Sequence, residues 1–326
     1  MLHDLMPVSP TKPRLRSALV SLTLLAASAV LLARPQDPSP GSEGPRFSQR
    51  GKWPEVDVGD PRLNKALSAI SRQASTFWQA ASSFTGREAL KQKAIVRRRR
   101  KPHFRQLQPP PEETNLKEQE MASYYGFSSF STAPEALREF RQIISIDEKQ
   151  LEDPAVARKK LQSLLVSKDD VRKKAVRATF EKENLRGAAV DFGQLILMFI
   201  RSRLAQYSFA SEKTAMVGTD RALVISFRQI EGNASLRISE PGRKMRIPVQ
   251  GELYVREEDD LVLRITITVG RLDGTVEIRD EAAVDYSPNP SSAILPVSVL
   301  YRRFLNDRLY FENTYRYSDW QAIEIK

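Results

Sequence analysis

The sequence predicts an α+β fold: a curved antiparallel β-sheet, resembling half of a barrel, with an N-terminal helix and a helical insertion covering one face. The first observation is an alternation of apolar and other residues from Leu261 to Val269, which is typical of a half-buried strand. The second is that the runs 249–256 and 275–286 flank it through short polar connections of hairpin length. The third is that helical patterns concentrate before this series, in 61–82 and 153–205.

The composition limits the classes of protein that the chain can represent. It has 326 residues, 41% hydrophobic and 28% charged, which favours a globular protein over one with many membrane-spanning helices. The absence of cysteine excludes disulfides, thiolate metal sites and thiol nucleophiles. With only His3 and His103, a histidine-based metal site or a Ser-His-Asp triad is not expected, and we predict no metal and no cofactor.

The N-terminal residues 1–33 predict an export signal. Lys12, Arg14 and Arg16 precede the uncharged stretch 17–33, which is either a cleaved signal peptide or an uncleaved inner-membrane anchor. Both alternatives place the rest of the chain in the periplasm. The net charge of +11 also lies at this end, because residues 1–105 hold 19 Lys/Arg against 7 Asp/Glu.

A tether and the start of a folded domain follow the export signal. Residues 34–59 are rich in proline, serine, glycine and charge, and we expect a disordered segment there. Asp60 and Pro61 are a favourable start for a helix over 61–82, and we expect residues 60–326 to form a single α+β domain. The next elements are expected in this order: an edge strand, favoured over an exposed helix, at 85–96, and strands at 118–130 and 140–146.

A basic segment interrupts these strands at 97–117, and we expect a protruding loop there because three prolines follow at 109–111. Its charged run consists of Arg97, Arg98, Arg99, Arg100 and Lys101. These residues are candidates for contact with an anionic membrane surface, and the alternative is an ordinary solvated loop. Nucleic acid is not expected as a partner, since the export signal removes the segment from the cytoplasm.

The insertion 153–205 supplies the candidate ligand site. Helices are expected from Asp153-Pro154, from 167–184 and over 192–204, and the last is apolar on nearly all sides. It is either a lid over an apolar cavity or ordinary core. The candidate ligand-binding residues are Leu195, Met198 and Phe199 on this helix, and Leu263, Ile265 and Ile267 on the strand series 206–326.

Several stretches resemble known protein families. The segments 124–130, 191–197 and 250–256, and the closing 315–320, look like recurring segments of a family of uncharacterised exported bacterial proteins. The order of elements is similar to the half-barrel of periplasmic lipoprotein-localisation factors and related sigma-factor regulators. That second resemblance implies a sheet that holds an acyl chain or a peptide beneath helices.

The functional prediction is a non-enzymatic, exported cell-envelope protein that binds a lipid or a hydrophobic peptide. The alternative is a structural or interaction protein that contacts another envelope protein and has no ligand cavity. No catalytic residues are assigned. Asp280 and Glu281, for example, are adjacent on a strand and therefore point to opposite faces. The acidic run 257–260 is interpreted as a hairpin turn and not as a calcium loop.

Overall fold

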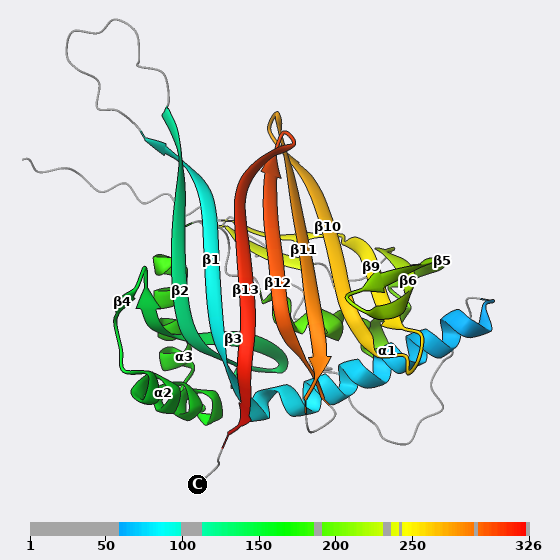
Figure 1. The fold of residues 1–326 in the computed structure, drawn as a ribbon, viewed down its shortest axis with the longest axis horizontal. Coiled ribbons are helices and arrows are strands. Elements are labelled where there is room, and N and C mark those ends of the chain that lie inside the picture. Colours follow the sequence, from blue (N-terminus) through cyan, green and yellow to red (C-terminus); the bar gives the residue numbers. More distant parts are fainter. Residues whose placement is uncertain are drawn as a thin grey trace, which may run out of the picture. The chain divides into compact units, whose positions relative to one another are not determined.

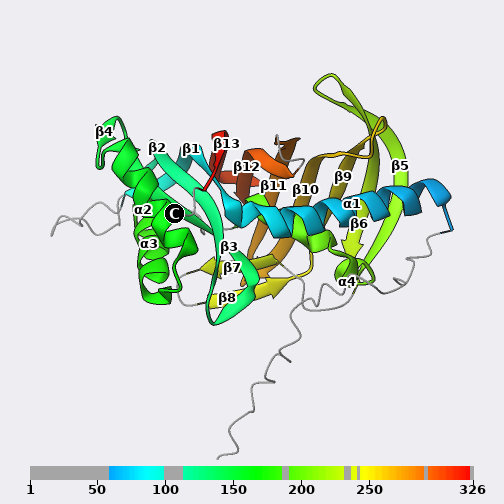
Figure 2. The same ribbon diagram turned by 90° about the horizontal axis from the view of Figure 1, so that it is seen from below.

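One large antiparallel sheet organises the molecule. The computed structural model describes residues 59–98, 113–185, 191–230, 236–240, 243–289 and 293–323. Eleven strands pair in the order β4-β3-β2-β1-β13-β12-β11-β10-β9-β6-β5 (Figure 1). Strands β7 and β8 form a separate hairpin (Figure 2). The predicted curved α+β fold is confirmed. The predicted export signal, residues 34–58 of the tether, and Arg99, Arg100 and Lys101 lie outside the described residues.

The elements have the following bounds. The strands are β1 (Phe84–Arg98), β2 (Glu113–Phe130), β3 (Ala133–Ile146), β4 (Lys149–Gln150), β5 (Tyr207–Val217), β6 (Asp220–Gln229), β7 (Leu236–Glu240), β8 (Arg243–Ile247), β9 (Gln250–Arg256), β10 (Val262–Asp273), β11 (Val276–Pro288), β12 (Ile294–Leu305) and β13 (Arg308–Ala322). The helices are α1 (Pro61–Ala80), α2 (Pro154–Val166), α3 (Asp170–Glu183) and α4 (Arg201–Leu204), with 3₁₀ helices η1 (Ala81–Ser83) and η2 (Phe192–Phe199).

The first and last strands in the sequence, β1 and β13, are neighbours within the sheet. β1 runs antiparallel to β13, with Leu90 opposite Tyr315, and β1 also pairs with β2 along its length. The strand predicted at 85–96 is therefore an interior strand and not an edge strand. The predicted loop 97–117 is also shorter than expected, because 97–98 end β1 and 113–117 begin β2.

Helix α1 defines what we call the inner face of the sheet. The Asp60 side chain accepts a hydrogen bond from the Arg62 N–H at 2.9 Å, and Pro61 occupies the first turn, as the sequence predicts. The buried side of α1 joins one hydrophobic cluster with inward-facing residues of strands β1, β6, β10 and β13. Figure 2 shows α1 lying across this face.

The helical insertion is divided between the two faces of the sheet. Leu161, Leu164 and Leu165 of α2 pack with Phe140 of β3 in a second, smaller cluster. Phe140 points away from the inner face, since its strand neighbours point the opposite way. Phe180 of α3 belongs instead to the inner cluster, so α3 reaches around the edge of the sheet.

Two local features differ from the sequence prediction. The helix expected over 192–204 is a 3₁₀ helix, irregular at Gln194, that ends at Ile200 before the single turn of α4. In β10, a bulge between Val262 and Arg264 breaks the strict alternation. Val262 therefore joins the inner cluster, and Leu263 is buried outside it.

Candidate functional site

The inner face brings together five of the six candidate ligand-binding residues. Leu195, Met198 and Phe199 of η2 belong to the same buried cluster as Ile265 and Ile267 of β10. The structure does not bring Leu263 to this cluster. The predicted arrangement, an apolar segment over an apolar sheet face, is therefore present, although the covering segment is η2 and not a regular α-helix.

Aromatic packing fills the space beneath η2. The Phe199 side chain is fully buried, and its ring lies 4.9 Å from that of Phe227 and 5.7 Å from that of Tyr207, measured between centroids. Both partners lie on strands, one on β6 and one on β5. In the state described by the structure, the chain's own side chains therefore occupy this part of the inner face.

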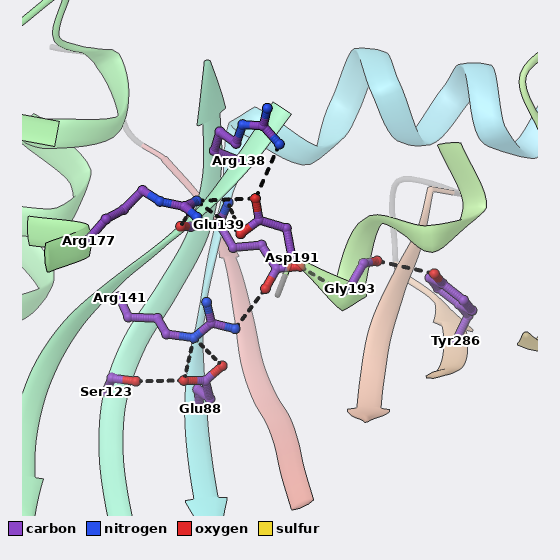
Figure 3. A network of polar contacts seen from close by, with 9 residues as sticks. All are labelled: Glu88, Ser123, Arg138, Glu139, Arg141, Arg177, Asp191, Gly193 and Tyr286. Carbon is purple, nitrogen blue, oxygen red and sulfur yellow. Dashed lines mark hydrogen bonds and ion pairs between the residues drawn. The ribbon is translucent and has the colours of Figure 1, made fainter. Parts of the chain in front are cut away.

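A buried charged network lies beside the start of η2 (Figure 3). The Arg141 Nε of β3 donates to both carboxylate oxygens of Glu88 on β1, each at 2.9 Å. Its Nη2 donates to Glu139 Oε2 at 2.7 Å, and Ser123 of β2 donates to Glu88 at 3.0 Å. One guanidinium thus serves two carboxylates, and we call Glu88, Glu139 and Arg141 the acidic cluster.

Aromatic rings enclose the guanidinium of the acidic cluster. The Arg141 Cζ lies 4.7 Å from the ring centre of Phe180, 5.0 Å from that of Tyr125 and 5.5 Å from that of Tyr315. Cation–π contact of this kind stabilises a desolvated cation. The three charged groups are consequently shut away from solvent, with Arg141 exposed by only 5%.

The acidic cluster also holds η2 in place. Glu139 Oε1 accepts a hydrogen bond from the Gly193 N–H at 2.6 Å. On the other side, the Tyr286 hydroxyl donates to the Gly193 carbonyl and accepts from the Ile196 N–H, both at 3.2 Å. Backbone groups at the start of η2 are therefore fixed by side chains of β3 and β11.

Asp191 forms a second link just before η2. Its carboxylate accepts from Arg177 of α3 at 2.9 Å and lies 3.5 Å from Arg138 of β3. It also accepts a long hydrogen bond, 3.4 Å, from the Glu139 N–H. The sequence suggests Asp191 as a cap for the helix that follows it, but its side chain makes no capping hydrogen bond. Asp191, Arg177 and Arg138 instead join α3, β3 and η2.

Only glycine fits at position 193. A Cβ there would lie 2.5 Å from the Tyr125 hydroxyl oxygen, 3.0 Å from Glu139 Oε1 and 3.1 Å from Pro296 Cγ. These distances are shorter than ordinary van der Waals contact. The absence of a side chain lets the backbone of η2 come within hydrogen-bonding distance of the Glu139 carboxylate.

Burial controls the ionisation of the acidic cluster. Desolvation raises the pKa of Glu139 to about 7, although Arg141 opposes the shift, and the negative charges of Asp191 and Glu88 add to it. Burial also opposes the charge of Arg141, yet Glu88 and Glu139 keep its pKa well above the usual value. Glu139 is thus the member of the network whose charge changes near neutral pH.

Sequence reasoning missed the acidic cluster, although a signal was present. Leu137, Glu139, Arg141 and Ile143 recur at every second position of β3, so they share the inner face. Two charged residues within a buried stripe indicate an internal ion pair. The partner Glu88 could not be found this way, because the register of β1 and β2 depends on the folded sheet.

A second buried ion cluster lies on the same face between β10, β11 and β12. Arg303 donates to both oxygens of Asp280 at 2.6 and 3.0 Å, and Arg271 donates to the same carboxylate at 3.1 Å. The Tyr301 hydroxyl donates to Asp280 at 3.0 Å. We call Asp280, Arg271 and Arg303 the basic cluster, because two cations share one carboxylate.

Only part of the predicted basic run lies within the described residues. Arg97 and Arg98 end β1, and the other three residues of the basic run are outside the described ranges. Within those ranges, no group of three or more His, Asp or Glu residues could hold a metal ion. The described helices include none with the length and apolar character needed to cross a membrane.

Comparison with known proteins finds only distant likeness. No family model and no curated protein matches the chain. Among solved structures, a LolA superfamily protein from Nitrosomonas europaea is 11% identical with a TM-score of 0.30, and the match covers 80% of this chain and 94% of that one. A DUF1329 family protein from Desulfovibrio piger is 9% identical with a TM-score of 0.32, covering 81% and 95%.

These neighbours match the resemblance to lipoprotein-localisation factors found in the sequence. At such TM-scores the likeness is no evidence of function. The resemblance to a family of uncharacterised exported bacterial proteins stays a prediction.

Proposed function

We propose that the protein is a non-enzymatic carrier of the cell envelope that binds an apolar or amphiphilic molecule on the inner face. The ligand would lie between η2 and strands β9 to β11, against Leu195, Met198, Phe199, Ile265 and Ile267. The observation that carries the proposal is that a short, irregular segment, η2, covers an apolar sheet face together with α1.

The covering segment is suited to displacement. A 3₁₀ helix has poorer hydrogen-bond geometry than an α-helix, and η2 is further interrupted at Gln194. Its start is instead held by side chains, through the bonds of Gly193 with Glu139 and Tyr286. Breaking a few such bonds would release η2 while the sheet beneath it keeps its own backbone hydrogen bonds.

The sheet face beneath η2 and α1 supports an acyl or similar apolar ligand. Inward-facing residues of β6, β9 and β10 are aliphatic or aromatic and are nearly all buried, and they are Leu223, Ile225, Phe227, Leu253, Val255, Val262, Ile265, Ile267 and Val269. The acidic cluster borders this surface at η2, so a polar head group could be accommodated beside it.

The proposed location is the periplasm, reached through the export signal of residues 1–33, with 17–33 either removed or kept as an inner-membrane anchor. The basic run Arg97 to Lys101 stays a candidate for contact with anionic lipid.

A second candidate function is an envelope interaction protein that binds no small molecule. The complete burial of Phe199 among Phe227 and Tyr207 favours this alternative, because the chain's own side chains fill the space and no ligand is needed there. Under this alternative η2 is permanent core, and a partner protein would bind elsewhere on the sheet.

Native mass spectrometry of the full chain purified from its cell envelope distinguishes the two. A co-purified lipid or peptide of reproducible mass supports the carrier, and binding of a fluorescent fatty acid to the purified protein supports it further. The absence of both a co-purified molecule and probe binding would reject the carrier and leave the interaction protein.

Two matched variants locate the ligand. Ile267→Trp adds bulk within the inner cluster that contains η2, whereas Leu263→Trp adds the same bulk on the same strand outside that cluster. We expect the first to weaken probe binding at least tenfold and the second less than twofold. Thermal unfolding of both variants verifies that each is folded, and equal loss of binding would place the ligand elsewhere.

A further inference from the structure

The outward surface of α2 and α3 is strongly basic. From the start of α2 at Pro154 to the end of α3 at Glu183, the sequence has nine Lys/Arg residues against four Asp/Glu. These helices lie together at one end of the sheet (Figure 1). Such a concentration of one charge on a surface requires a partner of opposite charge or serves as a solvated face.

The two aspartates of this region are already engaged by the chain itself. Asp169 caps α3 by accepting from the Arg172 N–H at 3.0 Å. Asp170 accepts from the N–H groups of Ser131 and Thr132 at 2.8 and 3.2 Å and from both hydroxyls. These hydrogen bonds lower the pKa of Asp170, with the Ser131 N–H first among them.

Three of the cations are used internally and others are available. Arg177 pairs with Asp191, and Lys160 pairs with Glu152. Lys173 is buried and donates to Ser128 Oγ at 2.9 Å and to the Ser129 carbonyl at 2.6 Å, which fixes α3 to β2. Lys159, Lys168 and Arg172 are exposed, and within the described part of the chain their side chains form no ion pair. A positive surface is thus presented by rigidly held helices.

Apolar side chains stand among these cations. Val166 is 57% exposed and Val171 is 78% exposed, on either side of the short connection that contains Lys168. Exposed valines have no role in binding an inorganic anion or a nucleic acid backbone. Aliphatic residues flanked by lysine and arginine are typical of a surface that inserts shallowly between lipid head groups.

We propose that the α2–α3 face docks onto a bilayer that contains anionic phospholipid. Val166 and Val171 enter the head-group region, and Lys159, Lys168 and Arg172 contact phosphates. The role is distinct from ligand binding on the inner face and does not depend on it. It also differs from the basic run Arg97 to Lys101, whose first two residues end β1.

The absence of cysteine makes a direct test possible. Single substitutions Val171→Cys, Leu116→Cys and Leu309→Cys in the full chain are labelled with an environment-sensitive dye and mixed with phosphatidylglycerol or phosphatidylcholine vesicles. Leu116 and Leu309 are 65% and 42% exposed, on β2 near the basic run and on β13 respectively. Because residues 17–33 can insert into either kind of vesicle, binding to vesicles does not by itself test the proposal. The test is the comparison between label positions and between the two lipids.

We expect a blue shift at Val171→Cys with phosphatidylglycerol only, and no shift at Leu309→Cys. A shift confined to Leu116→Cys would assign membrane contact to the basic run and overturn the proposal. An equal response of the Val171→Cys label to soluble polyglutamate would overturn it in favour of an acidic protein partner.

Charge reversal provides the second measurement. The triple variant Lys159→Glu, Lys168→Glu, Arg172→Glu should lower affinity for phosphatidylglycerol vesicles at least tenfold. The control reverses Lys117, Arg228 and Arg308, which are equally exposed but lie on strands β2, β6 and β13. A loss of similar size in the control would show non-specific attraction and reject the assigned surface.

Discussion

The acidic and basic clusters contain the same kinds of groups on the same sheet face, yet they have opposite stoichiometry. Glu88 and Glu139 share Arg141 in the first, whereas Arg271 and Arg303 share Asp280 in the second. Hydrogen bonds of the basic cluster join strand to strand. Those of the acidic cluster also reach the backbone of η2 through Gly193.

The excess charge explains why only the acidic cluster can change its charge near neutral pH. A surplus buried carboxylate is costly in its ionised form, and this raises the pKa of Glu139 towards neutrality. The surplus group in the basic cluster is an arginine, which stays protonated in proteins. The acidic cluster therefore connects the sheet to η2 through a titratable group. The basic cluster, built from similar residues, joins strands through groups that stay charged.

The largest expected effect comes from removing the shared cation of the acidic cluster. Arg141→Met leaves two buried carboxylates facing each other and should lower the free energy of unfolding by about 3–5 kcal/mol. Arg303→Met should cost less, because Asp280 keeps Arg271. Urea unfolding measures both, and an equal loss would mean that stoichiometry does not matter.

The next effect is a dependence of stability on pH. The folded-state pKa of Glu139, about 7, is above that of an ordinary glutamate, so the folded state binds a proton more tightly than the unfolded state. The contribution of Glu139 to the free energy of unfolding is fully present at pH 4 and is lost as pH rises through 7.

Glu139→Gln removes this contribution. Its stability relative to the wild type should therefore improve by about 1–3 kcal/mol between pH 5 and pH 8. Glu118→Gln, an exposed carboxylate of β2, controls for the loss of charge alone. A constant difference between Glu139→Gln and the wild type across this range would contradict the assignment.

The smallest expected effect is the difference in stability between two glycine-to-alanine substitutions. One is at Gly193, beside the acidic cluster, and the other is at Gly270, where an added Cβ would contact nothing. Gly193→Ala places a Cβ against Tyr125, Glu139 and Pro296 and should destabilise by about 1–2 kcal/mol. Gly270→Ala on β10 has no atom within 4 Å of its new Cβ and should be close to neutral. Thermal melts of the two variants provide the measurement, and equal melting temperatures would deny a special fit at Gly193.

Local sequence signals predicted much of this fold. Helices α1 and α2 begin as predicted, at Asp60-Pro61 and Asp153-Pro154. The alternation after Leu261 correctly predicts strand β10. The bulge at 262–264 escaped prediction because nothing in the local pattern marks it, and it exchanges Val262 for Leu263 on the inner face. The nearly uniform apolar character of 192–200 hides helix type, since 3₁₀ and α geometries bury such a segment equally well.

The site was less predictable than the fold. The apolar candidates were found because each lies within a periodic segment. The acidic cluster joins Glu88 to Arg141, 53 positions apart, through the register of β1, β2 and β3. Pairings of that kind are set by the whole sheet, so single-strand patterns cannot reveal them.

The antiparallel pairing of β1 with β13 has a consequence for biosynthesis. These two strands are far apart in the sequence, so the pairing at the centre of the sheet cannot form until β13 has been synthesised. Until then the nascent chain has unpaired strand edges on both segments, which chaperones can bind. Closure of the central seam is therefore a late event in folding.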